Sequence, residues 1–211
     1  MSRAPGFITL EGCEGVGKTT NANLIESLLQ EQGIPYIRTR EPGGTPLAES
    51  LRSLLLEKRE EQVHPLTEVL MVFAARAQHV TQVIRPALDA GQWVLCDRFT
   101  DASFAYQGGG RGISVQVLEQ LEQMVHAGLQ PDLTLYLDMP VELALSRIQS
   151  RELDRFEQEQ KQFFENVRNA YLLRAKTRPR FRIIDAGQKL EAVQQDIRGC
   201  MLDFIKGFMS T

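Results

Sequence analysis

The feature that most constrains this chain is an eight-residue segment near its start. It fits the pattern G-x-x-x-x-G-K-[ST] and reads Gly12-Cys13-Glu14-Gly15-Val16-Gly17-Lys18-Thr19. An apolar run at residues 7–10 precedes it, and a helical pattern of apolar residues follows over 19–32. In this setting the glycines let successive backbone N–H groups point inward and bind an anion at the helix N-terminus. The segment therefore predicts a phosphate-binding loop (P-loop) that leads from a strand into a helix.

Two side chains of the loop have predicted roles toward ATP and Mg²⁺. We expect Lys18 to reach the β- and γ-phosphates, and the Thr19 hydroxyl to take one position around Mg²⁺. By itself the loop indicates only that a nucleoside triphosphate binds. It leaves open a small-molecule kinase, a GTP-hydrolysing switch, and a motor or nucleic-acid ATPase.

The rest of the chain alternates short apolar runs with longer helical patterns, which predicts βαβ units on a parallel sheet. The expected strands are residues 7–10, 36–39, 93–96, 133–137 and 181–184. The expected helices are 19–32, 47–56, 66–90, 115–127, 141–150, 157–177 and one after Leu190. We expect one α/β domain over 1–211, a five-stranded parallel sheet flanked by helices, with ligands at the carboxyl ends of the strands.

The residues at the end of the expected third strand favour one of these three classes of P-loop protein. A GTPase should carry an Asn-Lys-x-Asp segment, and the sequence has none. A motor ATPase usually follows its strand-end Asp with Glu, whereas Asp97 is followed by Arg98. An arginine beside the expected Mg²⁺ region suits a second phosphorylated molecule, because a guanidinium binds phosphate oxygens in pairs. These residues favour a kinase and leave a P-loop ATPase switch that acts on a protein partner as the alternative.

Composition disfavours several other classes of protein. The net charge of −3 disfavours a protein that coats nucleic acid, and no run approaches the roughly 18 apolar residues of a membrane span. The three cysteines, Cys13, Cys96 and Cys200, are too scattered for a disulfide framework. We therefore expect a cytoplasmic protein with no nucleic-acid or membrane partner.

Further segments resemble the thymidylate kinase family. They are Asp97-Arg98-Phe99, the stretch 103–112, Arg40-Glu41-Pro42-Gly43-Gly44-Thr45 and residues 153–159, in the family's order over nearly the whole chain. The resemblance implies a P-loop nucleoside monophosphate kinase fold and a homodimer. It also implies transfer of the γ-phosphoryl group of ATP to dTMP, giving dTDP on the route to dTTP. Another nucleoside or nucleotide kinase is the nearest alternative.

The resemblance also implies roles for individual residues at the acceptor site. Arg52 and Arg98 are implied to clamp the acceptor phosphate, Glu14 to lie near the sugar 3′-hydroxyl, and Asp97 to act on Mg²⁺ through water. Ser103, Tyr106 and Gln107 are implied to read the base edge and crowd the 2′ position. The remaining substrate-binding residues implied in this way are Glu41, Pro42, Phe73 and Arg76.

Phe73 and Arg76 are implied to stack on the thymine and to donate to its carbonyl oxygen. Many relatives have Phe-x-x-x-Arg, whereas here one residue fewer separates the pair. Because one residue turns a helix by about 100°, anchoring Arg76 puts Val72 at the usual aromatic position. Phe73 then either stacks from a different angle or belongs to the core.

The arginine-rich stretch at about 147–158 is expected to form a mobile lid. The variable positions of the P-loop carry no basic residue, which resembles the family subtype whose lid supplies the catalytic arginine. Relatives often read Arg-Gly-x-Leu-Asp-Arg, and here Ser150-Arg151 shifts the first arginine by one position. We favour Arg151 as the catalytic arginine. Arg155 is the second candidate, unless an ion pair with Asp154 occupies it.

Overall fold

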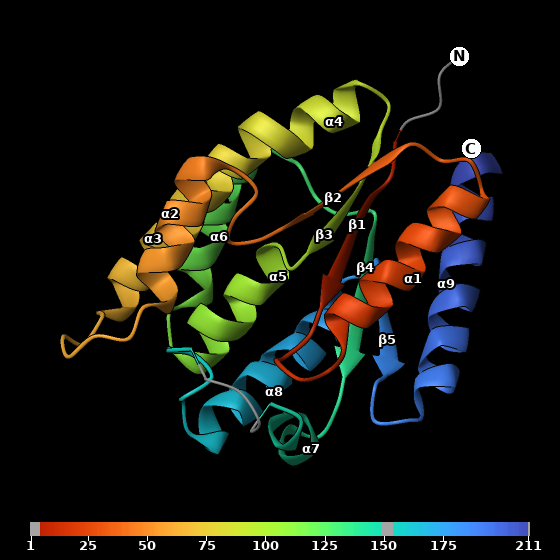
Figure 1. The fold of residues 1–211 in the computed structure, drawn as a ribbon. Helices are drawn as coiled ribbons and strands as arrows, with labels where there is room; N and C mark the ends of the chain where they lie inside the picture. The colour runs from red at the N-terminus through yellow and green to blue at the C-terminus, as the bar shows by residue number, and fades with distance from the viewer. Residues whose placement is uncertain (1–4, 149–153, 211) are drawn as a thin grey trace.

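The computed structural model describes residues 5–148 and 154–210. Within them, five strands are β1 (Phe7–Glu11), β2 (Tyr36–Arg40), β3 (Trp93–Asp97), β4 (Leu133–Asp138) and β5 (Phe181–Asp185). They form a parallel sheet in the order β2-β3-β1-β4-β5 (Figure 1). The predicted α/β class and five-stranded parallel sheet are therefore confirmed. Because β1 is central, the loop that leaves it opens at the carboxyl edge between β3 and β4.

The helices connect these strands along the chain. They are α1 (Lys18–Glu31), α2 (Pro46–Leu56), α3 (Pro65–His79), η1 (Val80–Ile84), α4 (Arg85–Asp89), α5 (Thr100–Ser103), η2 (Phe104–Gly110), α6 (Val115–His126), α7 (Val141–Ser146), α8 (Lys161–Thr177) and α9 (Leu190–Ser210). The elements η1 and η2 are π-helical turns. A wide turn of this kind often occurs near a functional site.

Four helical segments differ from the sequence prediction. The helix expected over 66–90 contains the π-turn η1 just before Pro86, which has no N–H for the regular helical bond. Helical residues 100–110 were missed, because three consecutive glycines make the segment a poor helix former. Helix α8 begins at Lys161 instead of residue 157, and α7 ends at Ser146 instead of residue 150. Residues 149 and 150 lie outside the described residues.

Successive residues of a strand pack against helices on opposite faces of the sheet. On β3, the Trp93 ring packs edge-on against Phe204 and Phe208 of α9, with ring centroids 5.6 and 5.3 Å away. Val94 and Cys96, which point the other way, are buried in a cluster with residues of η1 and α4. Figure 1 shows α1 and α9 along one side of the molecule and α2, α3 and α6 at the other.

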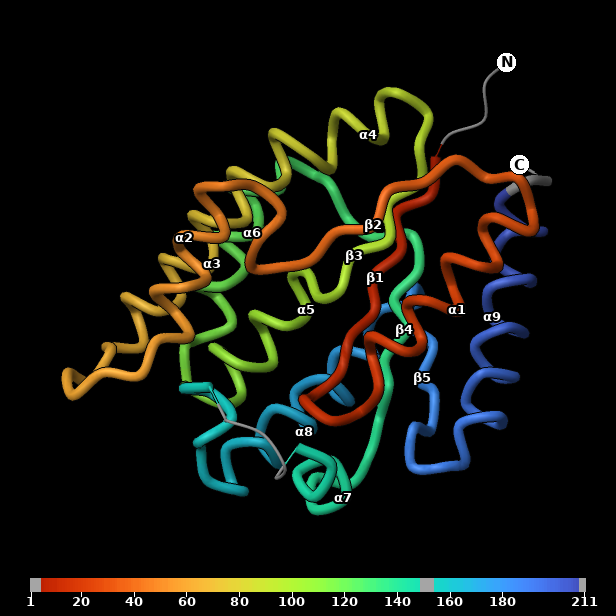
Figure 2. Tube along the Cα trace, in the orientation of Figure 1, coloured from red at the N-terminus to blue at the C-terminus, as the bar shows by residue number. Residues whose placement is uncertain are grey.

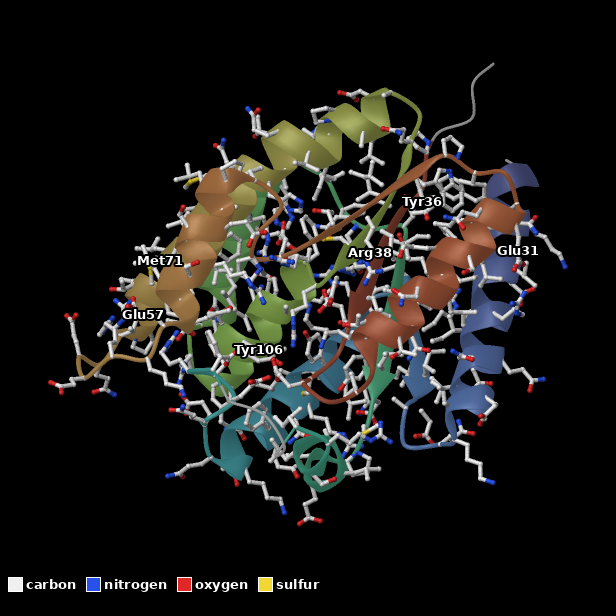
Figure 3. All side chains as sticks on the ribbon, in the orientation of Figure 1. Glu31, Tyr36, Arg38, Glu57, Met71 and Tyr106 are labelled. Atoms are coloured by element: carbon white, nitrogen blue, oxygen red, sulfur yellow. The ribbon has the colours of Figure 1, made fainter. Side chains whose placement is uncertain are left out.

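The sheet edge that carries the P-loop is also approached by α7. The trace in Figure 2 shows α7 next to the turn between β1 and α1. Figure 3 shows Tyr106 toward the interior, whereas Glu31 and Glu57 lie at the periphery. Tyr106 is buried, and both glutamates are exposed. Among helices of the described residues, none is long and apolar enough to cross a membrane.

Candidate active site

The P-loop connects β1 to α1, as the sequence predicted, and curls around the Lys18 ammonium. Lys18 Nζ donates to the carbonyl oxygens of Gly12 at 3.1 Å and of Cys13 at 2.9 Å. Gly15 has φ 77°, and a Cβ there would come within 2.2 Å of the Ala144 carbonyl oxygen in α7. Only glycine fits this position, so the close contact between the loop and α7 depends on it.

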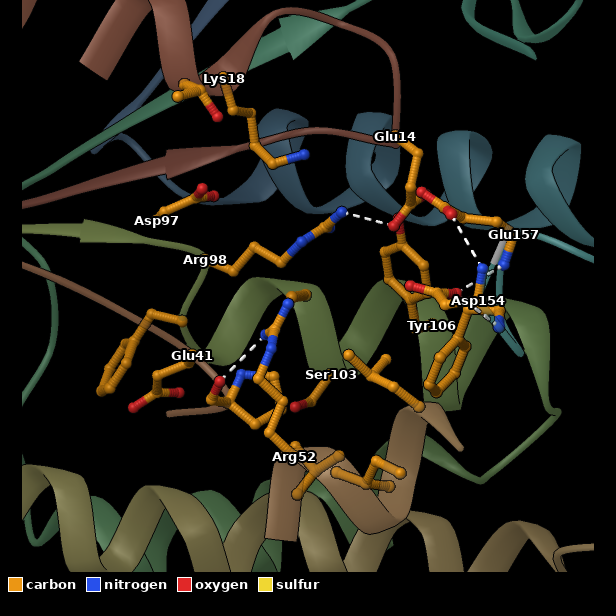
Figure 4. Close-up of a pocket in the computed structure, with 18 of the residues that line it drawn as sticks. Glu14, Lys18, Glu41, Arg52, Asp97, Arg98, Ser103, Tyr106, Asp154 and Glu157 are labelled. Carbon is orange, nitrogen blue, oxygen red and sulfur yellow. Dashed lines mark hydrogen bonds and ion pairs between the residues drawn. The ribbon is translucent and has the colours of Figure 1, made fainter. Parts of the chain in front are cut away.

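The loop forms one wall of a cavity of about 540 Å³ at the carboxyl edge of the sheet. The cavity brings together most of the predicted site residues: Glu14, Gly15, Gly17, Lys18, Thr19, Glu41, Pro42, Arg52, Arg76, Asp97, Arg98, Ser103, Tyr106 and Gln107. Figure 4 shows Arg98 between Lys18 and Asp97 on one side and Asp154 and Glu157 on the other. The described structure does not place Gly12, Cys13, Val16 or Phe73 among the lining residues.

Arg98 has an unusual backbone conformation at the edge of the cavity. Its backbone φ is 68°, in the left-handed region that non-glycine residues rarely occupy. Its Nη2 donates to Glu14 Oε1 at 2.7 Å, and the Tyr106 hydroxyl donates to Glu14 Oε2 at 2.7 Å. Burial alone would raise the pKa of Glu14, but Arg98 and Lys18 hold that pKa below its ordinary value. The Glu14 carboxylate is therefore kept ionised beside the P-loop.

Arg52 and Arg98 come from different elements and face one cavity. Arg52 Nη1 donates to the carbonyl oxygen of Pro42 at 3.0 Å. Burial, together with the positive charges of Arg40 and Arg98, lowers the pKa of Arg52. Because positive charges oppose one another here, an anion bound between Arg52 and Arg98 would relieve the repulsion. This arrangement can hold a phosphate.

Arg76 is fixed by a buried chain of hydrogen bonds. Its Nε donates to Glu41 Oε2 at 2.5 Å, and its Nη2 donates to the Phe99 carbonyl and to Ser103 Oγ, each at 3.0 Å. Glu41 Oε1 is 2.9 Å from His79 Nδ1. Arg76 Nη1 is buried and has no partner among the described residues. Since a buried donor needs an acceptor, this nitrogen of a cavity-lining side chain can donate to a ligand.

Phe73 does not reach the cavity. Its side chain is buried with Val69, Phe104 and Leu118, and the Arg76 guanidinium lies 4.7 Å from its ring centroid. Val72, one residue earlier, lines the cavity instead. The expected stacking role of Phe73 has no support in this geometry, because the shorter spacing to Arg76 turns its ring into the core.

The basic residues at 147–158 differ from one another in their environment. Arg147 is exposed and lines the cavity. Arg155 Nη2 donates to Glu68 Oε2 at 2.8 Å, and its Nε donates to the Leu55 carbonyl at 2.8 Å, so these two bonds go to other residues than Asp154, the alternative partner. Arg151, the favoured catalytic arginine, lies outside the described residues.

The residues predicted to serve Mg²⁺ fit that ion. Asp97 Oδ1 is buried without a partner among the described residues, and Asp97 and Thr19 line the same cavity. Oxygen ligands suit Mg²⁺, which usually takes only one or two protein carboxylates and completes its shell with water and phosphate. Accordingly, the part of the chain that is described has no group of three or more His, Cys, Asp or Glu arranged for a metal.

Two buried glutamates beside the cavity were missed by the sequence reasoning. Glu68 on α3 accepts from Gln107, Arg111 and Arg155, and so joins the cavity wall to the segment after residue 153. Glu11 at the end of β1 accepts from the Phe99 N–H and from the Tyr171 hydroxyl. A signal existed for both, because a carboxylate at a buried position of an apolar strand or helix face needs partners.

The buried Glu11 carboxyl has an unusual pKa. Burial and the negative charge of Asp101 raise this pKa to about 7, although the Tyr171 hydroxyl, Arg98 and the Phe99 N–H oppose the rise. Cys96, Arg98, Asp101, Tyr171 and Arg180 are among the groups whose charge or titration is coupled electrostatically to Glu11. A carboxyl in this state is protonated more readily in the folded chain than in the unfolded chain.

The pH dependence of stability should show this shift. A pKa raised by folding contributes stability below the unfolded pKa, and the contribution is lost as pH rises through the folded pKa. For Glu11 the window runs from 4.5 to about 7. The Tm of the wild type minus that of Glu11→Gln is therefore expected to fall between about pH 5 and about pH 8. Thermal unfolding at both pH values measures this, and a constant difference would contradict the raised pKa.

The matching family model and two similar known proteins carry the same description. A family model described as thymidylate kinase matches residues 10–197. A thymidylate kinase of Pseudomonas putida (strain GB-1) is 60% identical over 193 residues, which cover 90% of this chain and 92% of the relative. One of Teredinibacter turnerae (strain ATCC 39867 / T7901) is 57% identical over 201 residues, covering 94% and 98%. The residues that the family model matches include the P-loop, the cavity-lining residues and α8.

Proposed function

This chain belongs to the thymidylate kinase family, and we propose that it transfers the γ-phosphoryl group of ATP to dTMP, giving dTDP for dTTP synthesis. One observation supports the assignment of dTMP as the phosphoryl acceptor most directly. Arg52, Arg76 and Arg98 line the same cavity as the P-loop, so one molecule with a phosphate and a polar base edge can contact all three. The proposal covers ATP and Mg²⁺ as cofactors, a homodimer and a cytoplasmic location.

The proposed chemistry is direct transfer between two bound nucleotides. Arg52 and Arg98 hold the acceptor phosphate in line with the γ-phosphorus, to which an acceptor oxygen bonds as the bond to the bridging oxygen breaks. Lys18 and Arg98 neutralise charge on the transferring group. Mg²⁺, held by Thr19 and through water by Asp97, would supply further positive charge on the phosphate oxygens.

The remaining cavity residues are assigned to the sugar and the base. Arg76 Nη1, which has no partner among the described residues, is the proposed donor to a thymine carbonyl. Ser103, Tyr106 and Gln107 are the proposed contacts at the base edge and the 2′ side of the sugar. They line the cavity from α5 and η2, and each is at least nine-tenths buried. Glu14 is the proposed partner of the 3′-hydroxyl.

Acceptor choice tests the proposal. With each monophosphate offered singly, dTMP is expected to be used better than UMP or ribo-TMP by a factor on the order of 10² in kcat/KM. The reason is that Ser103, Tyr106 and Gln107 crowd the position of a 2′-hydroxyl. ATP consumption in a coupled assay measures the ratio. Equal use of UMP and dTMP would favour another nucleotide kinase, and rapid ATP hydrolysis with no monophosphate would favour a P-loop ATPase switch.

A further inference from the structure

Behind the cavity wall, Glu11 joins three parts of the molecule. It ends β1, its Oε1 accepts from the backbone N–H of Phe99 at 2.7 Å, and its Oε2 accepts from the Tyr171 hydroxyl of α8 at 2.7 Å. All three residues have a relative exposure of 0%. Neither Glu11 nor Tyr171 is among the residues that line the cavity in the described structure. Any effect of Glu11 on the reaction must therefore act through another residue.

That residue is Arg98, whose backbone is held from both sides. The Arg98 N–H donates to the Leu10 carbonyl at 3.0 Å, and Cys96 Sγ donates to the Arg98 carbonyl at 3.0 Å. The next peptide N–H, that of Phe99, is held by Glu11. A residue other than glycine keeps the left-handed backbone conformation only where its surroundings impose it. Such strain is common at functional sites. The bonds from Leu10, Cys96 and Glu11 supply those surroundings.

The backbone conformation of Arg98 decides where its guanidinium points. With φ at 68° the side chain enters the cavity, where it meets Glu14 and lies 4.8 Å from the Tyr106 ring centroid. Relaxation of the turn to negative φ would redirect the side chain. A displacement of about 1 Å in a positioning group can cost on the order of 10² in rate.

We propose that Glu11 is a positioning residue for phosphoryl transfer, because it fixes the Phe99 N–H and so holds Arg98 in the left-handed turn that aims its guanidinium at the acceptor phosphate. The inference rests on the proposed function. Tyr171 is the second member of this device, since its hydroxyl fixes the carboxylate in turn. Burial raises the pKa of Glu11, so the carboxylate occupies a position that disfavours its charge. Hydrogen bonding, more than charge, is the property that the position requires.

Two substitutions separate hydrogen bonding from charge. Glu11→Gln keeps an oxygen for the Phe99 N–H and a nitrogen for Tyr171, so kcat for dTMP is expected to stay within about threefold of the wild type. Glu11→Met keeps the length and removes the acceptor, so kcat should fall by about 10- to 100-fold while the Kd for ATP stays unchanged. The number of ATP-binding sites per chain separates a positioning role from a loss of folded protein. A positioning role leaves this number unchanged, whereas a loss of folded protein lowers it together with the apparent kcat.

A double-mutant cycle with Arg98→Ala supplies the decisive readout. If Glu11 acts through Arg98, Glu11→Met should lower kcat no further in the Arg98→Ala background. An equal loss in both backgrounds, or a folded Glu11→Met with wild-type kcat, overturns the inference. A wild type that does not phosphorylate dTMP defeats the proposed function instead, so the two failures are distinguishable.

Tyr171→Phe covers the case in which Glu11→Met does not fold. It removes only the hydroxyl that holds Glu11 and should lower kcat by about 3- to 10-fold, again only when Arg98 is present. Tyr136→Phe is the matched control: its ring stacks on Tyr171 at 4.8 Å, but its hydroxyl donates to Asp138. Tyr136→Phe should keep wild-type kcat. Equal effects of the two tyrosine substitutions, or no effect of Tyr171→Phe, count against Glu11.

Discussion

Arg98→Ala is expected to lower dTMP-dependent kcat by about 10³-fold or more while changing the Kd for ATP little. The side chain bonds to Glu14, lies in the same cavity as Arg52, and has a buried Nη1 without a partner among the described residues. It therefore has a free donor for the acceptor phosphate and a charge beside the transferring group. Steady-state kinetics and nucleotide titration measure the two quantities.

Arg98→Lys is the control for charge. Lysine keeps the positive charge but lacks the planar fork, so it should recover only part of the lost turnover. Without dTMP, ATP hydrolysis should be slow in every variant, since water has no phosphate for Arg52 and Arg98 to hold. Fast hydrolysis that needs no monophosphate and survives Arg98→Ala would be incompatible with a kinase.

The sequence predicted those parts of the site that depend on local pattern. The order strand, glycine-rich loop and helix placed Lys18 and Thr19, and the apolar run before Asp97 placed Arg98 at the end of a buried strand. Parallel strands bring their carboxyl ends to one edge, so these residues were expected to meet. The cavity that joins Lys18, Asp97 and Arg98 agrees with this expectation.

Local sequence patterns could not predict the contacts between segments that are distant in the sequence. Glu14 and Arg98 are 84 positions apart, and Glu11 and Tyr171 are 160 apart, so no periodicity links them. Phe73 shows a different limit, since helical spacing assigned it to one face but did not decide whether that face met the cavity or the core. Packing against Phe104 and Leu118 decided it.

Glu68, a buried residue on helix α3, changes the interpretation of Arg155 in the expected lid. Glu68 lies on the apolar face of this helix with a relative exposure of 0% and binds both Arg111 and Arg155. Arg155 was expected either to serve catalysis or to pair with Asp154. With its guanidinium donating to Glu68 and to the Leu55 carbonyl, it has a structural partner from α3 and another from α2. This geometry favours an anchoring role for Arg155.

Arg151→Ala is expected to lower kcat by at least roughly a hundredfold while changing the KM for dTMP little. The P-loop supplies one cation, Lys18, and charge develops on the γ-phosphoryl oxygens during transfer. An arginine that stabilises this charge contributes about 10³–10⁵ in turnover, whereas a surface charge that steers substrate contributes a few-fold. Measurement of kcat for Arg147→Ala, Arg151→Ala and Arg155→Ala side by side tests the assignment.

The other two substitutions serve as controls with different expected results. Arg147 is exposed at the cavity, so its loss should change kcat only a few-fold. Loss of Arg155 leaves the buried Glu68 with one partner fewer. Arg155→Ala should therefore lower the Tm, whereas the kcat of the folded variant should change little. If only Arg155→Ala abolishes turnover, the one-residue shift in the lid motif has moved the catalytic position. If none of the three does, residues 147–158 do not supply the charge, and Lys18, Arg98 and Mg²⁺ must account for the neutralisation.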